Sequence, residues 1–142
     1  MQTDRKTKII VQTTVPVSLD LAWEIWTKPE HIVRWNFASK DWHCPRAEND
    51  LKPNGKFSWR MEAKDASVGF DYSGVYEKVI PKEKIIKKLD DGRLVEIDFS
   101  ESENEVGILE TFEVEDQNSV ELQKTGWQAI LDNFKAYAIS KK

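Results

Sequence analysis

The chain has 142 residues, 39% of them hydrophobic, and its apolar content includes six Trp, six Phe and three Tyr. Its net charge is −4, and no basic stripe is interleaved with aromatic residues, which argues against nucleic-acid binding through phosphate neutralisation. Because a single cysteine cannot form an internal disulfide and no apolar run is long enough to span a bilayer, we expect a cytoplasmic protein without membrane insertion.

The N-terminal part predicts one strand and two short helices. Residues 7–15 are rich in β-branched side chains and favour a strand. Ser18 can cap a following helix, on which Trp23 and Trp26 recur at helical spacing and therefore pack into the core. Pro29 ends that helix and suits the first position of a second one.

Residues 36–54 predict a long irregular segment, and its length in a compact domain indicates that it is functional or partly ordered. The segment contains Trp42 and His43, and His43 is a candidate proton shuttle or ligand contact. Cys44 follows directly, but adjacent residues lack the spacing of metal ligands, so we expect no metal site.

Five runs of alternating apolar and polar residues follow, which is typical of half-buried strands. They cover residues 56–62, 70–80, 85–89, 95–99 and 106–114. Asp91-Gly92 indicates a type I′ hairpin between the third and fourth runs. The basic residues Lys82, Lys84, Lys87 and Lys88 are interrupted by Glu83, Ile85 and Ile86, and we interpret them as the solvated edge of a strand.

Glu110 is the most informative acidic residue. Strand alternation places it on the same face as Ile108 and Phe112, and hence toward the interior. A buried carboxylate must be paired, protonated or hydrated. It could anchor a ligand head group, act as a general acid or base, or form a structural pair with Arg60, Arg93 or a Trp indole.

The C-terminal residues predict a long amphipathic helix. Trp127, Ile130 and Phe134 recur at helical spacing, Ser119 or Asn118 can cap its start, Gln123 lies on a flanking position, and Gly126 suggests a close approach to the sheet. Helices and strands are segregated along the chain, which indicates an α+β fold. We predict a curved antiparallel sheet of about six strands wrapped around this helix, with two short helices after the first strand.

Four segments carry a family resemblance. AWEIWTKPEHIVRW, DLKPNGKF, ETFEVE and GWQAILDNFKAY occur in this order and cover much of the chain. Together they resemble the START-like (SRPBCC) superfamily, and within it the homologues of the activator of the Hsp-90 ATPase. The resemblance implies one START-like domain over residues 1–142, a helix-grip fold, and a cavity for a hydrophobic ligand between the sheet and the last helix.

We therefore predict a monomer that binds a lipid- or polyketide-like molecule, without a cofactor and without established catalysis. The alternatives are a co-chaperone-like protein, docking to the Hsp-90 chaperone around the Lys82–Lys88 strand, and a cyclase-like acid/base enzyme that uses Glu110 or His43. The predicted ligand-binding residues are Trp35, Trp42, His43, Phe57, Trp59, Met61, Tyr72, Phe99, Glu110, Phe112, Trp127, Ile130 and Phe134.

Overall fold

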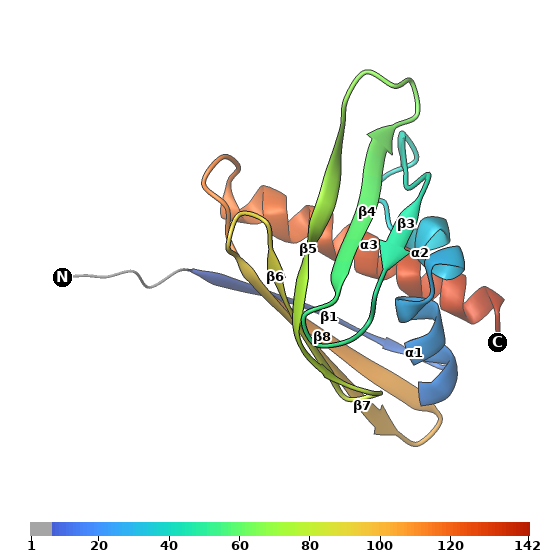
Figure 1. Ribbon diagram of the computed structural model, residues 1–142. Helices are drawn as coiled ribbons and strands as arrows, with labels where there is room; N and C mark the ends of the chain where they lie inside the picture. The colour runs from blue at the N-terminus through green and yellow to red at the C-terminus, as the bar shows by residue number, and fades with distance from the viewer. Residues whose placement is uncertain (1–6) are drawn as a thin grey trace.

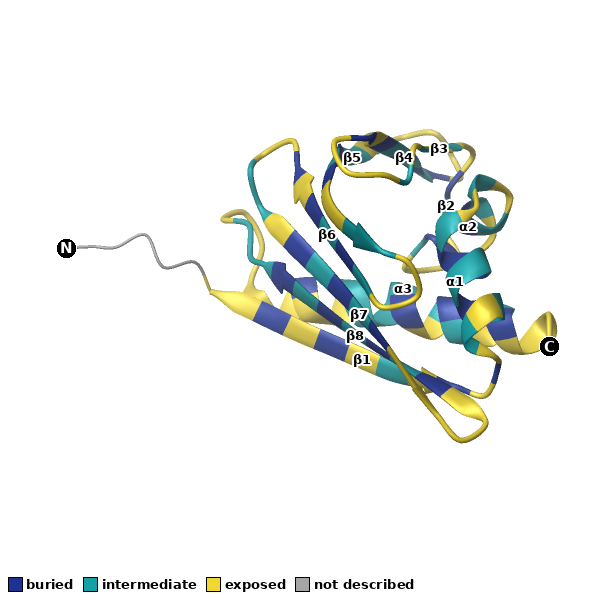
Figure 2. Ribbon diagram, turned by 60° about the horizontal axis from the view of Figure 1, so that its bottom comes forward, coloured by how far each residue is buried: buried dark blue, intermediate teal, exposed yellow. Residues whose placement is uncertain are grey.

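A computed structural model describes residues 7–142, and its elements follow the predicted order (Figure 1). Strand β1 (Lys8–Val15) is followed by helices α1 (Leu19–Thr27) and α2 (Pro29–Trp35), and the long helix α3 (Val120–Ser140) comes last. The strands between α2 and α3 form one sheet with β1, and the sheet curls around α3 (Figure 2). The predicted α+β helix-grip architecture is confirmed.

Six long strands form the body of the sheet, and all neighbours are antiparallel. The long strands after α2 are β4 (Lys56–Ala63), β5 (Gly69–Ile80), β6 (Lys84–Leu89), β7 (Leu94–Ser102) and β8 (Glu105–Glu113). The strand order is β1-β8-β7-β6-β5-β4-β2, with β3 also paired to β4. The first strand therefore lies beside the last one in the sheet.

The segment 36–54 is more regular than predicted. It contains β2 (Trp42–His43) and β3 (Ala47–Asn49), and both pair with β4. The prediction of an irregular segment was wrong at these residues, because the outer edge of β4 offers hydrogen-bonding partners to any backbone that runs beside it. Strands this short carry no readable alternation in the sequence.

The helix starts agree with the sequence prediction. The Ser18 hydroxyl accepts a hydrogen bond from the Leu21 N–H at 3.1 Å, and Ser119 accepts one from the Leu122 N–H at 3.0 Å. Pro29 occupies the first turn of α2, where its missing N–H leaves no helical bond unmade. Within residues 7–142, every helix is too short or too polar to cross a bilayer.

The hairpin between β6 and β7 was predicted correctly, but its turn type was not. A type I′ turn needs positive φ at both central residues, and of Asp91 and Gly92 only Gly92 has one, at 92°. The Leu89 N–H donates to the Arg93 carbonyl at 2.8 Å, which makes a three-residue loop. Such a loop needs one left-handed residue, and glycine supplies it.

The basic stretch is not the solvated edge that we predicted. Strand β6 lies between β5 and β7, and its alternation turns Ile85, Lys87 and Leu89 toward the interior (Figure 2). Lys87 is only 2% exposed. On the outer face, Lys84 pairs with acidic side chains of β7. The stretch is therefore divided between two faces, with Lys87 inside and Lys82, Lys84 and Lys88 outside.

Aromatic rings fill the space where α1 and α2 meet the sheet and α3. Trp26 lies 4.9 Å from Trp35 and 5.0 Å from Phe134 between ring centroids, and its edge meets Phe99 at 5.8 Å. The Trp35 indole N–H donates to the Ile25 carbonyl at 3.0 Å, so its polar atom is satisfied. We call the cluster of Trp26, Trp35, Phe99 and Phe134 the packed half of the interior.

Candidate functional site

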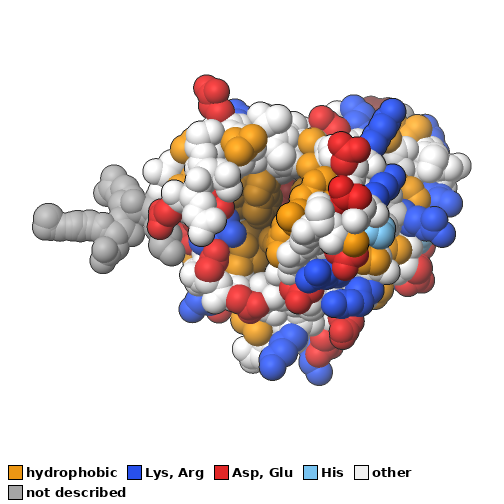
Figure 3. Space-filling view, turned by 90° about the horizontal axis from the view of Figure 1, so that it is seen from above, with side chains coloured by type: hydrophobic (Ala, Val, Ile, Leu, Met, Phe, Trp, Pro, Cys, Tyr) orange, Lys and Arg blue, Asp and Glu red, His pale blue; other side chains and the backbone are white. Residues whose placement is uncertain are grey.

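Beyond the packed half, the interior is hollow. A cavity of about 520 Å³ lies between the concave face of the sheet and the N-terminal half of α3. Seen from above, it is a deep opening with mostly hydrophobic walls and charged side chains near the rim (Figure 3). Trp26, Trp35 and Asn36 border its inner end, next to the packed half. We call this part of the interior the hollow half.

Three rings build the wall. Trp59 on β4 and Tyr72 on β5 stand opposite each other in the sheet register, with ring centroids 5.6 Å apart. Trp127 on α3 meets Tyr72 edge-on at 6.0 Å, and its other side stacks on Phe112 at 3.8 Å and an interplanar angle of 9°. The rings are held by their neighbours, so the wall is preformed.

Gly126 helps to keep the cavity open. We predicted that it allows a close approach of α3 to the sheet, and this prediction was wrong. A Cβ atom added at Gly126 would meet no heavy atom within 4 Å, and the residue lines the cavity. The helix position faces space, and the absence of a side chain enlarges that space.

Lys87 is the cation of the cavity floor. Its Nζ lies 4.3 Å from the ring centroid of Trp59, 4.6 Å from Tyr72 and 4.8 Å from Phe57. The negative faces of aromatic rings attract an ammonium group at such distances. Burial nevertheless disfavours the charge and lowers the pKa of Lys87 to about 8, while Glu110 acts in the opposite direction.

Glu110 faces the same interior, as predicted. It is 7% exposed, and in the register it stands opposite Ile97 of β7 and Val11 of β1. Burial raises the pKa of Glu110 to about 7, and the positive charge of Lys87 limits the increase. A carboxyl group and an ammonium group therefore share one low-dielectric floor, and each is pushed toward its neutral form.

The structural partners that we considered for Glu110 are engaged elsewhere. The Arg60 Nε binds the Glu62 carboxylate at 3.0 Å, and the Arg93 Nε binds Asp91 at 2.8 Å. The Trp59 indole N–H donates to Asn49 at 3.4 Å. Among residues 7–142, no side chain or backbone group forms a hydrogen bond or an ion pair with the carboxyl group of Glu110 or with the ammonium group of Lys87. Their interaction is electrostatic and not a direct contact.

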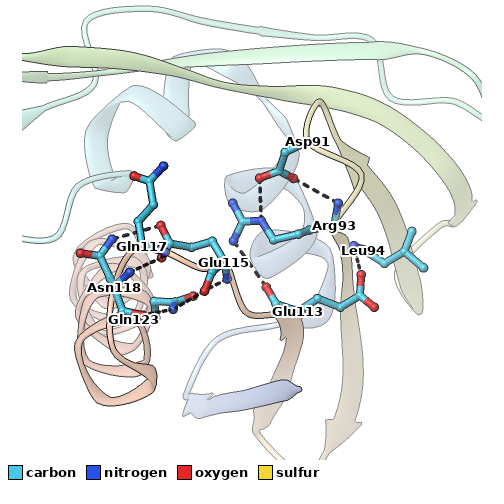
Figure 4. Close-up of polar contacts among 8 residues, drawn as sticks. All are labelled: Asp91, Arg93, Leu94, Glu113, Glu115, Gln117, Asn118 and Gln123. Carbon is cyan, nitrogen blue, oxygen red and sulfur yellow. Dashed lines mark hydrogen bonds and ion pairs between the residues drawn. The ribbon is translucent and has the colours of Figure 1, made fainter. Parts of the chain in front are cut away.

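Polar side chains organise the rim of the cavity (Figure 4). The Arg93 Nη1 donates to the Glu113 carbonyl at 3.4 Å, while Asp91 holds its Nε. Across the opening, the Glu115 carboxylate accepts hydrogen bonds from the N–H groups of Gln117 at 3.0 Å and Asn118 at 2.6 Å. These bonds fix the two loops that frame the entrance.

Gln123 secures the second of these loops to α3. Its Nε2 donates to the carbonyl oxygens of Asn118 at 2.9 Å and Glu115 at 3.2 Å, and its Oε1 accepts from the Glu115 N–H at 2.9 Å (Figure 4). We predicted a flanking position, and the residue is in fact 7% exposed. It is buried because the β8–α3 loop folds over it.

The structure brings together seven of the predicted ligand-binding residues. Those that line the cavity are Trp35, Trp59, Met61, Tyr72, Glu110, Trp127 and Ile130. Phe57 and Phe112 lie one layer behind the wall, against the ring cage of Lys87 and the Trp127 ring respectively. The role of these residues in ligand binding stays a prediction.

The other predicted residues lie away from the cavity lining. Phe99 and Phe134 belong to the packed half. Trp42 and His43 lie on β2 at the sheet edge, where Trp42 contacts Phe70 at 6.1 Å between centroids and His43 Nε2 lies 3.6 Å from Glu62.

Sequence reasoning missed Lys87 as a cavity residue. The signal that could have found it is the alternation of Ile85, Lys87 and Leu89, which puts the lysine between two apolar residues on one strand face. We read the residue with its basic neighbours instead. Arg93 and Gly126 also line the cavity, and the sequence gives no local reason to place them there.

The sheet that grips α3 defines this chain as a protein with the START-like (SRPBCC) helix-grip fold. The family model described as "Activator of Hsp90 ATPase homolog 1-like protein" matches residues 16–138, and the chain belongs to this family. The predicted family relationship is thereby confirmed. None of the curated proteins matches the chain.

Solved structures agree with this assignment. The solution structure of an AHSA1-like protein from Aeromonas hydrophila is 36% identical, with a TM-score of 0.89 and coverage of 95% of this chain and 94% of that chain. Chr148 from Cytophaga hutchinsonii is 43% identical, with a TM-score of 0.82 and coverage of 94% and 93%. NE0264 from Nitrosomonas europaea, at 16% identity and a TM-score of 0.81 over 98% of each chain, shares the fold.

Proposed function

We propose that this protein binds an apolar small molecule in the cavity between the sheet and α3. The observation that carries the proposal is a cavity of about 520 Å³ whose wall is formed by Trp59, Tyr72 and Trp127. Ligand sites in proteins have volumes of roughly 300–1,000 Å³ and combine apolar walls with a few polar groups. Lys87 and Glu110 are the polar groups of the floor.

The cavity also carries costs that a solid core would avoid. Glycine within a helix is about 1 kcal/mol less favourable than alanine, yet Gly126 faces the open space. Protein interiors are otherwise packed as densely as organic crystals, so a void of this size loses many dispersion contacts. A binding function explains why the chain retains both features.

A chaperone partner is the second candidate, because the family is described by its likeness to the activator of the Hsp90 ATPase. Addition of the protein to a purified Hsp90 chaperone should then raise the ATPase rate, and an unchanged rate together with no pull-down would rule this role out. The acid/base enzyme stays a prediction as well. Glu110, with a pKa raised to about 7 by burial, could transfer protons near neutral pH.

Substitution of Gly126 tests the binding function directly. Gly126→Leu should place a side chain in the cavity and abolish binding of apolar compounds, while the better helix propensity of leucine preserves the fold. Gly126→Ala is the matched control, since it makes the same helix change with little loss of space. Binding is followed by thermal shift with fatty acids, sterols and aromatic polyketides, and by mass spectrometry of the extracted protein.

Two results would contradict the proposal. One is the absence of both a co-purifying compound and a thermal shift with every library member. The other is equal binding by Gly126→Leu and Gly126→Ala, which would place any bound compound outside this cavity.

A further inference from the structure

The floor of the cavity points to the polar part of the ligand. We propose that the ligand is an apolar molecule with a single carboxylate group, that this carboxylate binds between Lys87 and Glu110, and that the complex takes up one proton. This inference rests on the proposed function, because it needs the cavity to admit a ligand.

The first argument is the unmet hydrogen-bonding capacity of Lys87. An ammonium group carries three N–H donors. The neighbours of Nζ are the ring faces of Phe57, Trp59 and Tyr72, and no oxygen or nitrogen atom of residues 7–142 accepts a hydrogen bond from it. Ring faces stabilise the positive charge, but they offer no lone pairs to the N–H donors. The ammonium group therefore lacks a hydrogen-bond acceptor such as an oxygen atom.

The second argument is that Glu110 has the same deficit. Its carboxyl group is buried, lines the same cavity and receives no hydrogen bond from the described part of the chain. An incoming carboxylate can accept hydrogen bonds from the Lys87 ammonium and from the O–H of protonated Glu110. One ligand group therefore satisfies both side chains.

The proton follows from the balance of charges. In the empty cavity, the charge of Lys87 is cancelled to the extent that Glu110 is ionised, which is mainly above its pKa of about 7. A bound carboxylate adds one negative charge at low dielectric, where two neighbouring carboxylates cannot both stay ionised. Glu110 takes a proton from solvent, and the complex then contains one ammonium, one carboxylate and one neutral carboxyl group.

The remaining ionisable groups around the cavity fit an anionic ligand. Tyr72 is partly buried beside the pair, and burial, followed by the charge of Glu110, raises its pKa well above the usual 10, so it stays neutral. Arg93 and Glu115 lie at the rim, where backbone N–H groups already bind the Glu115 carboxylate. Within residues 7–142, the cavity lining from α1, α2, β4 and α3 contains no ionisable group. Asp91 already pairs with the Arg93 guanidinium, so Lys87 is the cation that the floor offers to an anionic ligand.

The same arrangement disfavours ligands whose polar group is not a carboxylate. A cationic ligand would have to compete with Lys87 for the ring cage. A phosphate monoester would bring nearly two negative charges to a floor with a single ammonium group. The rings of Trp59, Tyr72 and Trp127 require an apolar body on the ligand.

The test compares compounds that share a skeleton and differ in the polar group. We suggest naphthyl, biphenyl and dodecyl skeletons, each as the carboxylic acid, the primary alcohol and the primary amide, with affinities measured by calorimetry at pH 6.5. We expect at least one acid to bind ten times more tightly than its alcohol and its amide. Lys87→Met should remove this preference and leave binding of the alcohol within about threefold.

Controls separate the inference from a folding defect and from the proposed function. Lys88→Met changes the exposed neighbour of Lys87 on the same strand and should retain the full preference for the acid. If an alcohol binds as tightly as its acid in every skeleton, the inference fails while the cavity still binds ligands. If no compound of any skeleton binds, the proposed function fails too.

Proton uptake is a separate readout. Because burial and Lys87 together place the pKa of Glu110 at about 7, free protein already carries the proton below pH 6 and must acquire it above pH 7. Affinity for the acid should be flat below pH 6 and fall toward tenfold per pH unit above pH 7, while affinity for the alcohol changes little. At pH 8, calorimetry in two buffers of different ionisation enthalpy should give an uptake of at least one proton for wild type, because Glu110 and the neutral fraction of Lys87 both become protonated. The uptake should be smaller for Glu110→Gln, which keeps only the Lys87 contribution. Zero proton uptake by the wild type at pH 8 would overturn the mechanism.

Discussion

The two halves of the interior lie against the same helix and the same sheet face, yet one is solid and the other is hollow. Both are rich in rings: Trp26, Trp35 and Phe134 in the packed half, Tyr72 and Trp127 in the hollow half. They differ in the number of elements that cover them. Helices α1 and α2 insert rings into the packed half, whereas the first half of α3 and the β8–α3 loop cover most of the other. Helix α3 runs along the sheet over both halves (Figure 1). A high aromatic content therefore does not by itself predict a cavity.

The polar atoms divide in the same way. In the packed half, the Trp35 indole donates to the Ile25 carbonyl. In the hollow half, Lys87 and Glu110 have no hydrogen-bonding partner among residues 7–142. The polar groups of a packed core form hydrogen bonds within the protein, whereas those of the cavity floor would form them with a bound ligand.

Truncation of one ring in each half should give the largest difference in the free energy of unfolding. Trp35→Ala should lower the free energy of unfolding by about 3–5 kcal/mol, because the ring is 1% exposed, packs on Trp26 and Phe134, and leaves a void when it is lost. Trp127→Ala should cost only about 1–2 kcal/mol, mainly the stacking on Phe112, because one side of this ring already faces space. Urea denaturation measures both. Equal losses would mean that the hollow half is as tightly packed as the other.

Removal of the buried ionisable pair should change the free energy of unfolding less than Trp35→Ala does, and it should stabilise the protein instead of destabilising it. The double variant Lys87→Met with Glu110→Leu should raise the free energy of unfolding, on the order of 2–3 kcal/mol near pH 7.5, since apolar side chains avoid the cost of dehydrating two charges. Lys88→Met, on the exposed face, should change it by less than about 0.5 kcal/mol.

The stability gained by the double variant should depend on pH in a defined direction. Burial raises the pKa of Glu110 to about 7, so folded protein loses stability as the pH rises from about 4.5 to 7. Burial lowers the pKa of Lys87 to about 8, so folded protein regains stability between about pH 8 and 10.5. The difference between the double variant and wild type should therefore be largest at pH 7–8. A pH-independent difference would argue against a buried ionisable pair.

Gly126→Ala should give a small effect, an increase of about 1 kcal/mol in the free energy of unfolding from helix propensity alone. The reason is that the new methyl group enters open space. Gly74→Ala is a contrasting control, because its Cβ would lie 2.1 Å from the Lys88 carbonyl oxygen and should destabilise the sheet. Thermal denaturation distinguishes the two signs. A loss of stability in Gly126→Ala would mean that the helix is closer to its neighbours than the structure shows.

The sequence by itself determined the helices, the six long strands and their order. Alternation along residues 106–114 placed Glu110 inside, Ser18 and Ser119 set the helix starts, and Pro29 separated α1 from α2. These features depend on neighbours in the chain, so local patterns carry them. The segregation of helices from strands indicated a sheet wrapped around α3, and the resemblance to a known family added the cavity between them.

Only the tertiary structure decided what faces the cavity. Lys87 is buried because β6 lies in the middle of the sheet with this face turned inward, and Gly126 faces space because the cavity separates this part of α3 from the sheet. Phe99 and Phe134 carry the same apolar character as the cavity wall, but they lie under those helices. Apolar periodicity shows which face of a helix or strand is turned to the interior. Whether the space next to that face is packed or hollow depends on the distance between the elements.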